Sequence, residues 1–413
     1  MATLITNIKS LINVRNVPSV IRGKQLKDLP VIDNAYLIVE DGFIADFGKM
    51  EECEFTVKDF ATSFDATGKM ILPSWCDSHT HLVFPASREN EFIDKINGLS
   101  YSEIAAKGGG ILSSANKLAH LSEDELYNDA YKRLQAVAKM GTGAIEIKSG
   151  YGLSVEGELK MLRVIKRLKQ NSSVVIKATF LGAHAVPAAY KQNKKGYIKT
   201  ILEEMLPAIA DQKLADFIDV FCEEGFYTPA ETELICRAGA AYGLKAKIHA
   251  NQLTVSGGVE AAVNVGALSA DHLESMDEAS IQALAHSNTM GTLLPSAAFF
   301  LRMPYQPARK LIDADCLIAL ASDYNPGSSP SGNMNFVIAL SCIQMKMQPE
   351  EAINAATLNG AYAMDVHDVA GSITIGKFAN LILTKEIPSI HYLPYAFGEN
   401  NIENIMLRGN WLS

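Results

Sequence analysis

The chain has 413 residues, of which 48% are hydrophobic and 20% are charged, and its formal net charge is −9. A chain of this length exceeds what one small core can use, so we expect one large domain and a smaller one. The acidic balance argues against nucleic acid or an anionic membrane as the main partner. It does not argue against a small anionic substrate, which needs only a local cation.

The cysteines and the first residues indicate the compartment. Six cysteines are scattered along the chain without a C-x-x-C pair. The segment MATLITNIKS lacks the apolar core of a signal peptide, and no run of about 18 apolar residues occurs anywhere. We therefore expect reduced thiols packed as small hydrophobes, in a cytoplasmic protein.

Both ends of the chain show short strands and turns. Near the start, NAYLIVEDGFIADFG consists of two apolar runs joined by Asp41-Gly42, which is a strong hairpin signal. Near the end, GSITIGKFANLILTKE and ENIMLRGNWLS show the same pattern. We predict that residues 1–69 and 366–413 pair into one small β-sandwich domain.

Between residues 70 and 365, strand-like runs alternate with helical ones. Eight apolar runs occur in this part, namely ILPSWCD, GAIEIKSGYG, VVIKATFLGAHAVP, FIDVFCEEG, LKAKIHANQ, ALSADHLE, NTMGTLLPS and CLIALASDYNPG. Capping-box patterns mark helix starts between them, at Ser122-x-x-Glu125, Thr228-Pro229-x-Glu231 and Ser275-x-x-Glu278. Eight β-α units over this length predict an α/β fold, a (β/α)8 TIM barrel.

Polar residues follow these apolar runs directly, at the barrel rim where catalysis takes place in this architecture. In SHTHLVF, His79 and His81 are two residues apart, so in an extended chain they point to the same side and could ligate one metal ion. Later runs end in or are followed by Tyr151, His184, His249, His272 and Asp323. Five histidines at one rim are more than structural histidines alone would explain. The remaining four lie in helical or loop contexts with no motif partner in the sequence, and we interpret them as surface or structural residues: His120, His286, His367 and His391.

The order H-x-H, His, His, Asp is that of the amidohydrolase superfamily of metal-dependent hydrolases. More closely, the chain resembles the imidazolonepropionase family in HTHLVFPASRENEF, KGGGILSS, EIKSGYGL, SADHLE and SDYNPGSSP. The resemblance extends to PYAFGENNIENIMLRG and so covers essentially the whole chain. It implies hydrolysis of the cyclic amide of 4-imidazolone-5-propanoate to N-formimidoyl-L-glutamate in histidine degradation, and a homodimer.

The resemblance also implies a metal site. One Zn²⁺ or Fe³⁺ ion per subunit would be held by His79, His81, His249 and Asp323. Three imidazoles and one carboxylate suit either ion and leave a position for water, whose pKa a metal lowers toward ~7. His272 is then placed to polarise the ring carbonyl or shuttle a proton, and Asp323 to accept a proton from the water.

Many amidohydrolases that act on rings carry H-x-x-E at the histidine of strand five, whereas this chain has HANQ. The amide of Gln252 can hydrogen-bond a ring nitrogen or carbonyl, but it cannot relay a proton. Imidazolonepropionases tolerate either residue. A deaminase relies on the carboxylate to protonate the departing amine, so Gln252 weakens that alternative.

The propanoate tail of the implied substrate needs a cation. We predict that Arg88, in PASRENEF, binds the carboxylate through two parallel hydrogen bonds. Tyr101, Tyr151 and His184 match the substrate-contacting positions of the family. The turn in DYNPGSSP suits close approach of a ligand carboxylate through Asn325, Gly327 and Ser328. The segment GGGILSS, residues 108–114, lacks the lysine of a phosphate loop and is interpreted as a mobile loop over the site.

Two alternatives stay open. The same scaffold could deaminate a purine or pyrimidine, although Gln252 and Arg88 argue against it. The chain could also be a non-catalytic scaffold protein, although such relatives have lost metal ligands and every ligand is present here. Metal content discriminates between them, because a scaffold protein should purify without stoichiometric zinc or iron.

Overall fold

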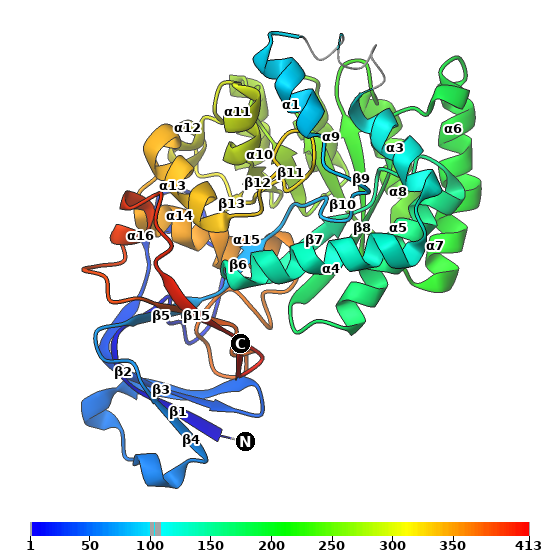
Figure 1. Ribbon diagram of the computed structural model, residues 1–413. Coiled ribbons are helices and arrows are strands. Elements are labelled where there is room, and N and C mark those ends of the chain that lie inside the picture. Colours follow the sequence, from blue (N-terminus) through cyan, green and yellow to red (C-terminus); the bar gives the residue numbers. More distant parts are fainter. Residues whose placement is uncertain (1, 100–102, 104–108, 413) are drawn as a thin grey trace.

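The computed structural model describes residues 2–99, 103 and 109–412, and its largest part is the predicted (β/α)8 barrel (Figure 1). Eight parallel strands lie in chain order around it: β6 (Trp75–Asp77), β7 (Thr142–Lys148), β8 (Val175–Ala183), β9 (Phe217–Cys222), β10 (Lys245–Ala250), β11 (Ser269–His272), β12 (Met290–Leu293) and β13 (Ile318–Leu320). A parallel bridge between Thr80 and Tyr324 joins the extensions of the first and last strands. All eight strands correspond to predicted apolar runs.

Helices surround the strands and bury them on the outside. The described helices are α1 (Glu89–Ile96), α3 (Gly110–His120), α4 (Glu123–Lys139), α5 (Val155–Gln170), α6 (Lys194–Thr200), α7 (Leu206–Gln212), α8 (Pro229–Ala240), α9 (Gly258–Asn264), α10 (Glu278–Ala285), α11 (Pro295–Leu301), α12 (Ala308–Asp313), α13 (Met334–Met345), α14 (Pro349–Ala356), α15 (Leu358–Ala363) and α16 (Tyr392–Tyr395). A π-helical turn, Ile201–Met205, joins α6 to α7. Short 3-10 turns occur at Gly23–Lys27, Met50–Glu52, Val57–Asp59 and Ala188–Tyr190. Because helices cover the sheet, every residue of β7 and β9 is buried, as expected for parallel strands.

Two of the three predicted capping boxes are confirmed and one is wrong. Ser122 and Thr228 each accept a hydrogen bond from the backbone of the glutamate three residues later. At the third position, α10 begins at Glu278 itself, so this glutamate lies too early in the helix to complete a box with Ser275. Asp277 caps α10 instead, and its carboxylate accepts the backbone N–H of Ser280 at 2.8 Å.

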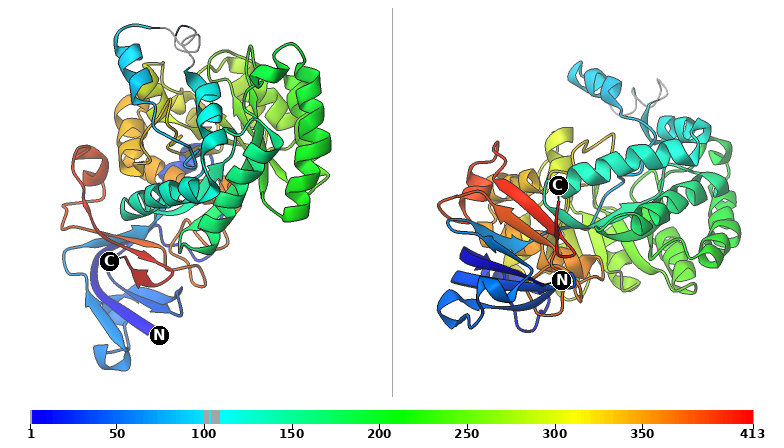
Figure 2. Two further views of the ribbon diagram at one scale, coloured as in Figure 1. Left: turned by 45° about the vertical axis from the view of Figure 1, so that its right-hand side comes forward. Right: turned by 60° about the horizontal axis from the view of Figure 1, so that its bottom comes forward.

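The chain ends form a small domain beside the barrel, and both termini lie in it (Figure 2). Its mixed sheet has the order β16-β15-β14-β5-β1-β2-β3, with β4 paired to β1. The strands are β1 (Ala2–Ile12), β2 (Val31–Glu40), β3 (Phe43–Lys49), β4 (Thr62–Asp65), β5 (Met70–Pro73), β14 (Leu381–Thr384), β15 (Ile402–Leu407) and β16 (Asn410–Trp411). Side chains from strands of both chain ends share one apolar core, which includes Ile8, Leu37, Ile71, Leu381 and Met406.

Two details of this domain follow from local sequence. The hairpin at Asp41-Gly42 is confirmed, because these two residues connect the paired strands β2 and β3. Their φ angles are 49° and 90°, and positive φ at both central residues is typical of a two-residue hairpin turn. The apolar run before His79 divides at Ser74: β5 pairs with β1 and β14 in the small domain, while β6 begins the barrel. The predicted domain boundary at residue 70 stays a prediction.

The described helices and the six cysteines also bear on the expectations drawn from composition. No helix among the described residues has both the length and the apolar character needed to cross a bilayer. All six cysteines are free thiols, and four of them are buried: Cys76, Cys222, Cys236 and Cys316.

Candidate metal centre and active site

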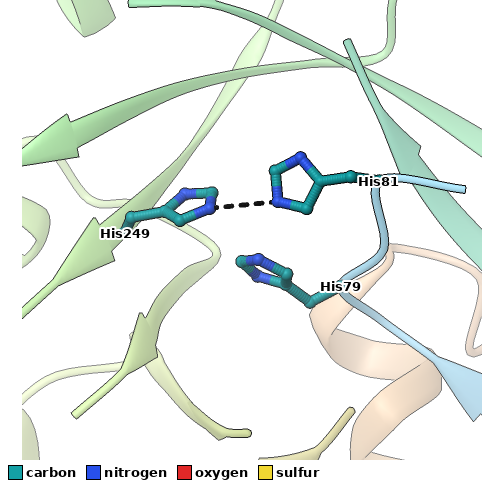
Figure 3. A group of neighbouring side chains, drawn as sticks. All are labelled: His79, His81 and His249. Atoms are coloured by element: carbon teal, nitrogen blue, oxygen red, sulfur yellow. Dashed lines mark hydrogen bonds between the residues drawn. The ribbon is translucent and has the colours of Figure 1, made fainter. Parts of the chain in front are cut away.

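Three imidazoles converge at the carboxyl ends of the barrel strands (Figure 3). His79 and His81 lie on the segment that follows β6, and His249 lies in β10. The Nε2 atoms of His81 and His249 are 3.4 Å apart, and the rings of His79 and His249 are 4.5 Å apart between centroids. The three nitrogens that could serve as ligands all lie within 4.8 Å of one another.

Asp323 adds a carboxylate to this group. Its Oδ1 lies 3.6 Å from Nε2 of His79 and 3.8 Å from Nε2 of His81. Ligands bound tetrahedrally at 2.0–2.1 Å are separated by about 3.4 Å, so these spacings suit one ion. Among the described residues, the buried Nε2 of His79 has no hydrogen-bond partner. The four predicted ligands therefore fit a metal by spacing and by donor type.

The pKa values of the candidate ligands also suit metal binding. Burial, helped by neighbouring imidazoles and Lys148, holds the pKa of His79, His81 and His249 well below its ordinary value. The imidazoles are therefore neutral at physiological pH, which is the form that ligates a metal. Burial raises the pKa of Asp323 to about 6, so a nearby cation would favour its ionised form.

Two aspartates lie behind these imidazoles, close to the Nδ1 atoms of His79 and His249. Oδ2 of Asp271 lies 2.6 Å from Nδ1 of His79, and Oδ2 of Asp219 lies 2.9 Å from Nδ1 of His249. The hydrogen bond between Nδ1 of His79 and Asp271 fixes the tautomer of His79 and directs its Nε2 toward the metal position. The contact between Nδ1 of His249 and Asp219 lacks hydrogen-bond geometry, and Asp219 instead accepts the backbone N–H of His249 at 3.1 Å. No motif identifies these aspartates, but an aspartate inside the buried run FIDVF is a signal, since burying an unpaired charge is costly.

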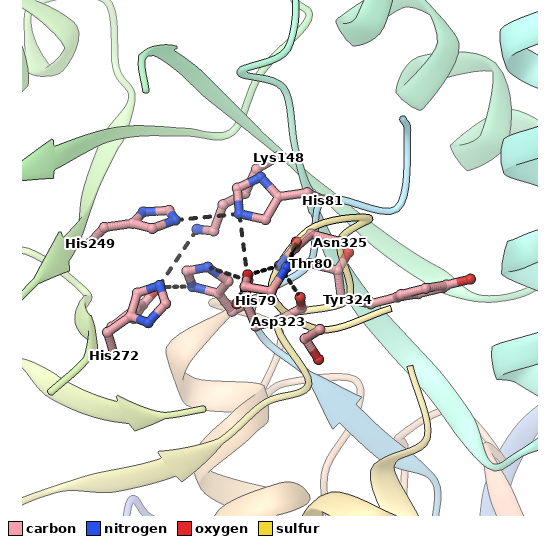
Figure 4. A network of polar contacts seen from close by, with 12 residues as sticks. His79, Thr80, His81, Lys148, His249, His272, Asp323, Tyr324 and Asn325 are labelled. Carbon is pink, nitrogen blue, oxygen red and sulfur yellow. Dashed lines mark hydrogen bonds and ion pairs between the residues drawn. The ribbon is translucent and has the colours of Figure 1, made fainter. Parts of the chain in front are cut away.

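Lys148 lies beside the site histidines (Figure 4), and it belongs to a fully buried group of charges in the barrel interior. Nζ of Lys148 lies 2.5 Å from Glu146, 2.8 Å from Asp219 and 3.6 Å from Asp271. Lys247 also binds Glu146. Burial alone would lower the pKa of Lys148, but the three carboxylates outweigh it and raise this pKa. Lys148 thus links the two aspartates that lie behind the metal-site histidines.

His272 ends β11 and faces the same space. Its backbone φ is 89°, an uncommon value for a residue other than glycine, and its ring centroid lies 5.2 Å from that of His249. Its Nδ1 lies 3.4 Å from Oε1 of Glu274, which also accepts a hydrogen bond from Gln306 at 2.9 Å. Burial alone would lower the pKa of His272, but Glu274 and nearby aspartates outweigh it and raise this pKa. His272 can therefore hold a proton.

A cavity of about 880 Å³ opens above these groups. Its wall includes seven residues predicted to contact substrate, namely Arg88, Tyr151, His184, Gln252, Asn325, Gly327 and Ser328. Tyr101, the eighth, lies outside the described residues. The outer wall is apolar and includes Phe92, Phe226, Phe299 and Phe300. The structure thus brings the predicted contacts and the candidate metal ligands into one space.

Arg88 lies at the start of α1, on the wall of the cavity. Its Nη2 binds Oε2 of Glu91 at 2.6 Å, and the guanidinium packs against Gly327. A Cβ on Gly327 would lie 2.6 Å from Nη1 of Arg88, so a larger residue there would displace the guanidinium. Nζ of Lys95 donates a hydrogen bond to the carbonyl oxygen of Gly327 at 2.7 Å. The arginine is held in place against this turn.

The turn after β13 connects Arg88 with the metal position. Oδ1 of Asn325 accepts hydrogen bonds from the backbone N–H groups of Gly327 and Ser328, both at 2.8 Å. Oγ of Ser328 donates to Oδ2 of Asp323 at 3.1 Å. The same short segment therefore shapes the cavity wall and steadies the candidate metal carboxylate.

His184 and Tyr151 form a neighbouring wall. Nδ1 of His184 lies 3.0 Å from the carbonyl oxygen of Gly150, and its ring stacks on His81 with centroids 5.2 Å apart. Burial lowers the pKa of His184 to about 4, so its ring is neutral at physiological pH. The ring of Tyr151 lies 5.6 Å from that of His184.

The segment GGGILSS, predicted to be a mobile loop, is partly helical. Gly110–Ser114 form the start of α3, and the N–H of Gly110 binds Oε1 of Glu91 at 2.9 Å. Gly108 lies outside the described residues. Movement of this segment stays a prediction.

The barrel, the converging imidazoles and the rim aspartate define a metal-dependent hydrolase of the amidohydrolase type. The model of the amidohydrolase family matches residues 70–412. The imidazolonepropionases of Flavobacterium johnsoniae and Christiangramia forsetii are 56% and 53% identical to this chain, each over 99% of both chains. The chain therefore belongs to the imidazolonepropionase family within the amidohydrolases, as predicted, and is a hydrolase that acts on carbon–nitrogen bonds.

Solved structures support the fold alone. Guanine deaminase from E. coli superposes with a TM-score of 0.76 at 13% identity, covering 100% of this chain and 99% of the other. A zinc-bound adenosine deaminase from Xanthomonas campestris gives a TM-score of 0.70 at 16% identity, covering 99% and 92%. These likenesses confirm the barrel with its small domain. They do not bear on the substrate.

Proposed function

We propose that this protein hydrolyses the ring amide of 4-imidazolone-5-propanoate to N-formimidoyl-L-glutamate, the imidazolonepropionase reaction of histidine degradation. The observation that carries the proposal is the 56% identity over 410 residues to an imidazolonepropionase. The cavity supports it, because the cationic Arg88 shares a wall with imidazoles suited to a metal. A cyclic amide with a carboxylate tail needs both features.

The proposed cofactor is one Zn²⁺ or Fe³⁺ ion per subunit, held by His79, His81, His249 and Asp323. When bound, the ion would lower the pKa of a water molecule toward ~7 and supply hydroxide at neutral pH. The spacing of the four donors and the neutral state of the imidazoles support this assignment.

The side chains of the cavity bind the substrate and transfer the protons. Arg88 binds the propanoate carboxylate and so positions the ring carbonyl. Asp323 accepts the proton of the attacking water. His272 donates a hydrogen bond to the carbonyl oxygen as negative charge develops, and it protonates the departing ring nitrogen. Gln252 hydrogen-bonds the ring without transferring a proton.

Further substrate contacts are proposed for the remaining wall residues. The rings of Tyr151 and His184 contact the substrate, and Tyr101, which lies outside the described residues, is assigned a substrate contact from the family resemblance alone. The turn after β13 approaches the substrate closely through Asn325, Gly327 and Ser328. Deamination of a nitrogen heterocycle is less well supported, because Gln252 leaves no glutamate at the position that protonates a departing amine.

Incubation of the purified enzyme with fresh 4-imidazolone-5-propanoate tests the proposal. We expect N-formimidoyl-L-glutamate to appear as the substrate is consumed, and its absence would overturn the proposed function. His79→Ala should lose both bound metal and turnover. The matched control His120→Ala changes an exposed histidine on α3 and should keep both. Normal metal content and turnover in His79→Ala would overturn the ligand assignment.

We also propose a division into residues 1–69, 70–365 and 366–413, a cytoplasmic location and a homodimer. Light scattering coupled to size-exclusion chromatography tests the dimer, since a monomer of 44.8 kDa is readily distinguished from twice that mass. Fractionation of producing cells tests the location.

A further inference from the structure

Glu158 is a fully buried carboxylate that binds the loop after β7. It lies in the first turns of α5, directly behind residues 150–153. Oε2 accepts the N–H of Gly150 at 2.9 Å, and Oε1 accepts those of Gly152 and Leu153 at 2.8 and 2.9 Å. One side chain therefore binds three of the four backbone N–H groups of this short loop.

The described part of the chain places no cation beside this carboxylate. Among the residues that the structure describes, no lysine, arginine or histidine nitrogen lies within 4.0 Å of Glu158. Burying a charge is costly unless hydrogen bonds replace those of water, and here backbone N–H groups replace them. Burial raises the pKa of Glu158, while the hydroxyl of Ser149 and the three backbone N–H groups favour its ionised form and oppose this shift. The hydrogen-bonding capacity of this carboxylate is used to shape the loop.

The loop needs such support because its backbone is unusual. Gly150 has a φ of 109°, and Leu153 has a φ of 46°, in the left-handed region that side chains rarely adopt. Gly152 packs so closely on α5 that a Cβ there would lie 2.2 Å from the backbone nitrogen of Glu158. The motif SGYGL thus has a physical reason: its glycines allow the loop to reach the carboxylate.

The loop in turn places two side chains on the cavity wall. Tyr151 lies between two of the bound N–H groups, and its ring faces those of His81 and His184. The carbonyl oxygen of Gly150 lies 3.0 Å from Nδ1 of His184. Movement of the loop would therefore shift both Tyr151 and His184.

We propose that Glu158 is the positioning residue for Tyr151 and His184, holding the loop after β7 in the shape that the substrate site requires. This role rests on the proposed function, in which both side chains contact the substrate. Glu158 itself contacts neither the substrate nor the metal ligands. Loss of its carboxylate should weaken substrate binding while bound metal stays in place.

Amide hydrogen exchange tests the positioning without any substrate. In the wild-type protein, the N–H groups of Gly150, Gly152 and Leu153 should exchange as slowly as the interior of α5. Glu158→Gln replaces one acceptor by an N–H₂ donor, so these three amides should exchange about tenfold faster or more. Glu156→Gln, an exposed change of the same kind on α5, should leave them unchanged. Unprotected loop amides in the wild-type protein would overturn the proposal, whether or not any variant folds.

Kinetics then test the link to the site. We expect Glu158→Gln to raise KM about tenfold, the size of one hydrogen bond to a charged group, with smaller changes in kcat and normal metal content. In a background carrying Tyr151→Phe and His184→Asn, the same change should raise KM much less, because it acts through these side chains. An equal rise in both backgrounds, or a wild-type KM in Glu158→Gln, would overturn the proposal. If the wild-type enzyme does not hydrolyse the substrate, the proposed function fails, while the exchange experiment still decides the role of Glu158 in the loop.

Discussion

The carboxylate of Asp271 lies 2.6 Å from Nδ1 of His79, and both side chains are fully buried. At this distance the carboxylate accepts the Nδ1–H, which leaves the lone pair of Nε2 directed toward the candidate metal position. The contact joins residues 192 positions apart, so folding of the barrel prepares the ligand before a metal arrives.

Asp271→Asn should therefore weaken metal binding. The amide can still accept a hydrogen bond, but it carries no charge to raise the basicity of the imidazole, so we expect affinity to fall ~10–100-fold. Competition with a chelator measures this affinity directly. Asp211→Asn, an exposed change on α7, is the matched control and should bind metal like the wild type. Equal affinities in the two variants would contradict the orienting role.

Removal of the metal should lower stability as well as abolish turnover. A ligand that binds only the folded state stabilises it by ~2.7 kcal/mol when its concentration is 100 times its Kd. We expect dialysis against a chelator to lower the thermal midpoint, and addition of zinc or iron to restore both the midpoint and turnover. A midpoint that does not respond to metal would argue against a site made of His79, His81, His249 and Asp323.

Lys148→Met should destabilise the barrel strongly. The lysine is surrounded by the carboxylates of Glu146, Asp219 and Asp271. Its loss removes the lysine partner of both aspartates, while Glu146 keeps its contact with Lys247. Breaking a buried ion pair by removing one partner costs ~3–5 kcal/mol, which denaturation by urea can measure. Lys169→Met is the control, because Nζ of this half-exposed lysine lies 3.5 Å from its partner Asp216. A similarly small loss of stability in both variants would show that Lys148 contributes little to the stability of the barrel.

The fold was largely predictable because a parallel barrel strand is buried on both faces and reads as a continuous apolar run. All eight runs became barrel strands. The errors lie at element boundaries. The apolar run before His79 forms one strand in each of the two sheets, because the chain passes from the small domain to the barrel at Ser74. At α10, the capping-box spacing alone did not show that Asp277 lies one residue nearer the helix and caps it.

The residues at the rim of the site were easier to predict from the sequence than the buried residues behind them. His249 and Asp323 stand out because each follows an apolar strand at the end where barrels carry their chemistry. Lys148 does not stand out, because its partners Asp219 and Asp271 are brought to it by the fold. Asp219 lies 71 positions from Lys148 in the chain, the difference between their residue numbers. The local sequence pattern does not distinguish a charged residue that is buried and paired from one that is exposed to solvent.

Arg88→Ala should raise KM while the metal stays bound. A charge-assisted contact to a carboxylate is worth ~1.5–3 kcal/mol, which corresponds to a rise of roughly ten- to 150-fold. Steady-state kinetics with metal analysis checks both parts. Arg237→Ala, an exposed arginine on α8, should keep the wild-type KM. An unchanged KM in Arg88→Ala would mean that another group binds the propanoate tail.

The roles of His272 and Gln252 can be separated by their kinetic signatures. The pKa of His272 is raised by Glu274 and nearby aspartates against the effect of burial, so this ring can hold the proton that the leaving nitrogen needs. His272→Asn should lower kcat ~10²–10⁴-fold, the usual size of general acid–base catalysis. KM should change little, because the interaction forms mainly in the transition state, and metal content should stay near normal.

Gln252→Ala should act mainly on substrate binding. It removes one neutral hydrogen bond worth ~0.5–1.5 kcal/mol, so KM should rise modestly and kcat should stay close to the wild-type value. Gln252→Glu is the matched variant, because it keeps the size of the side chain and adds a carboxylate. If only hydrogen bonding matters at this position, the added carboxylate should be tolerated or mildly harmful. Abolished turnover in Gln252→Ala, together with a nearly intact His272→Asn enzyme, would reverse the two roles and contradict proton transfer by His272.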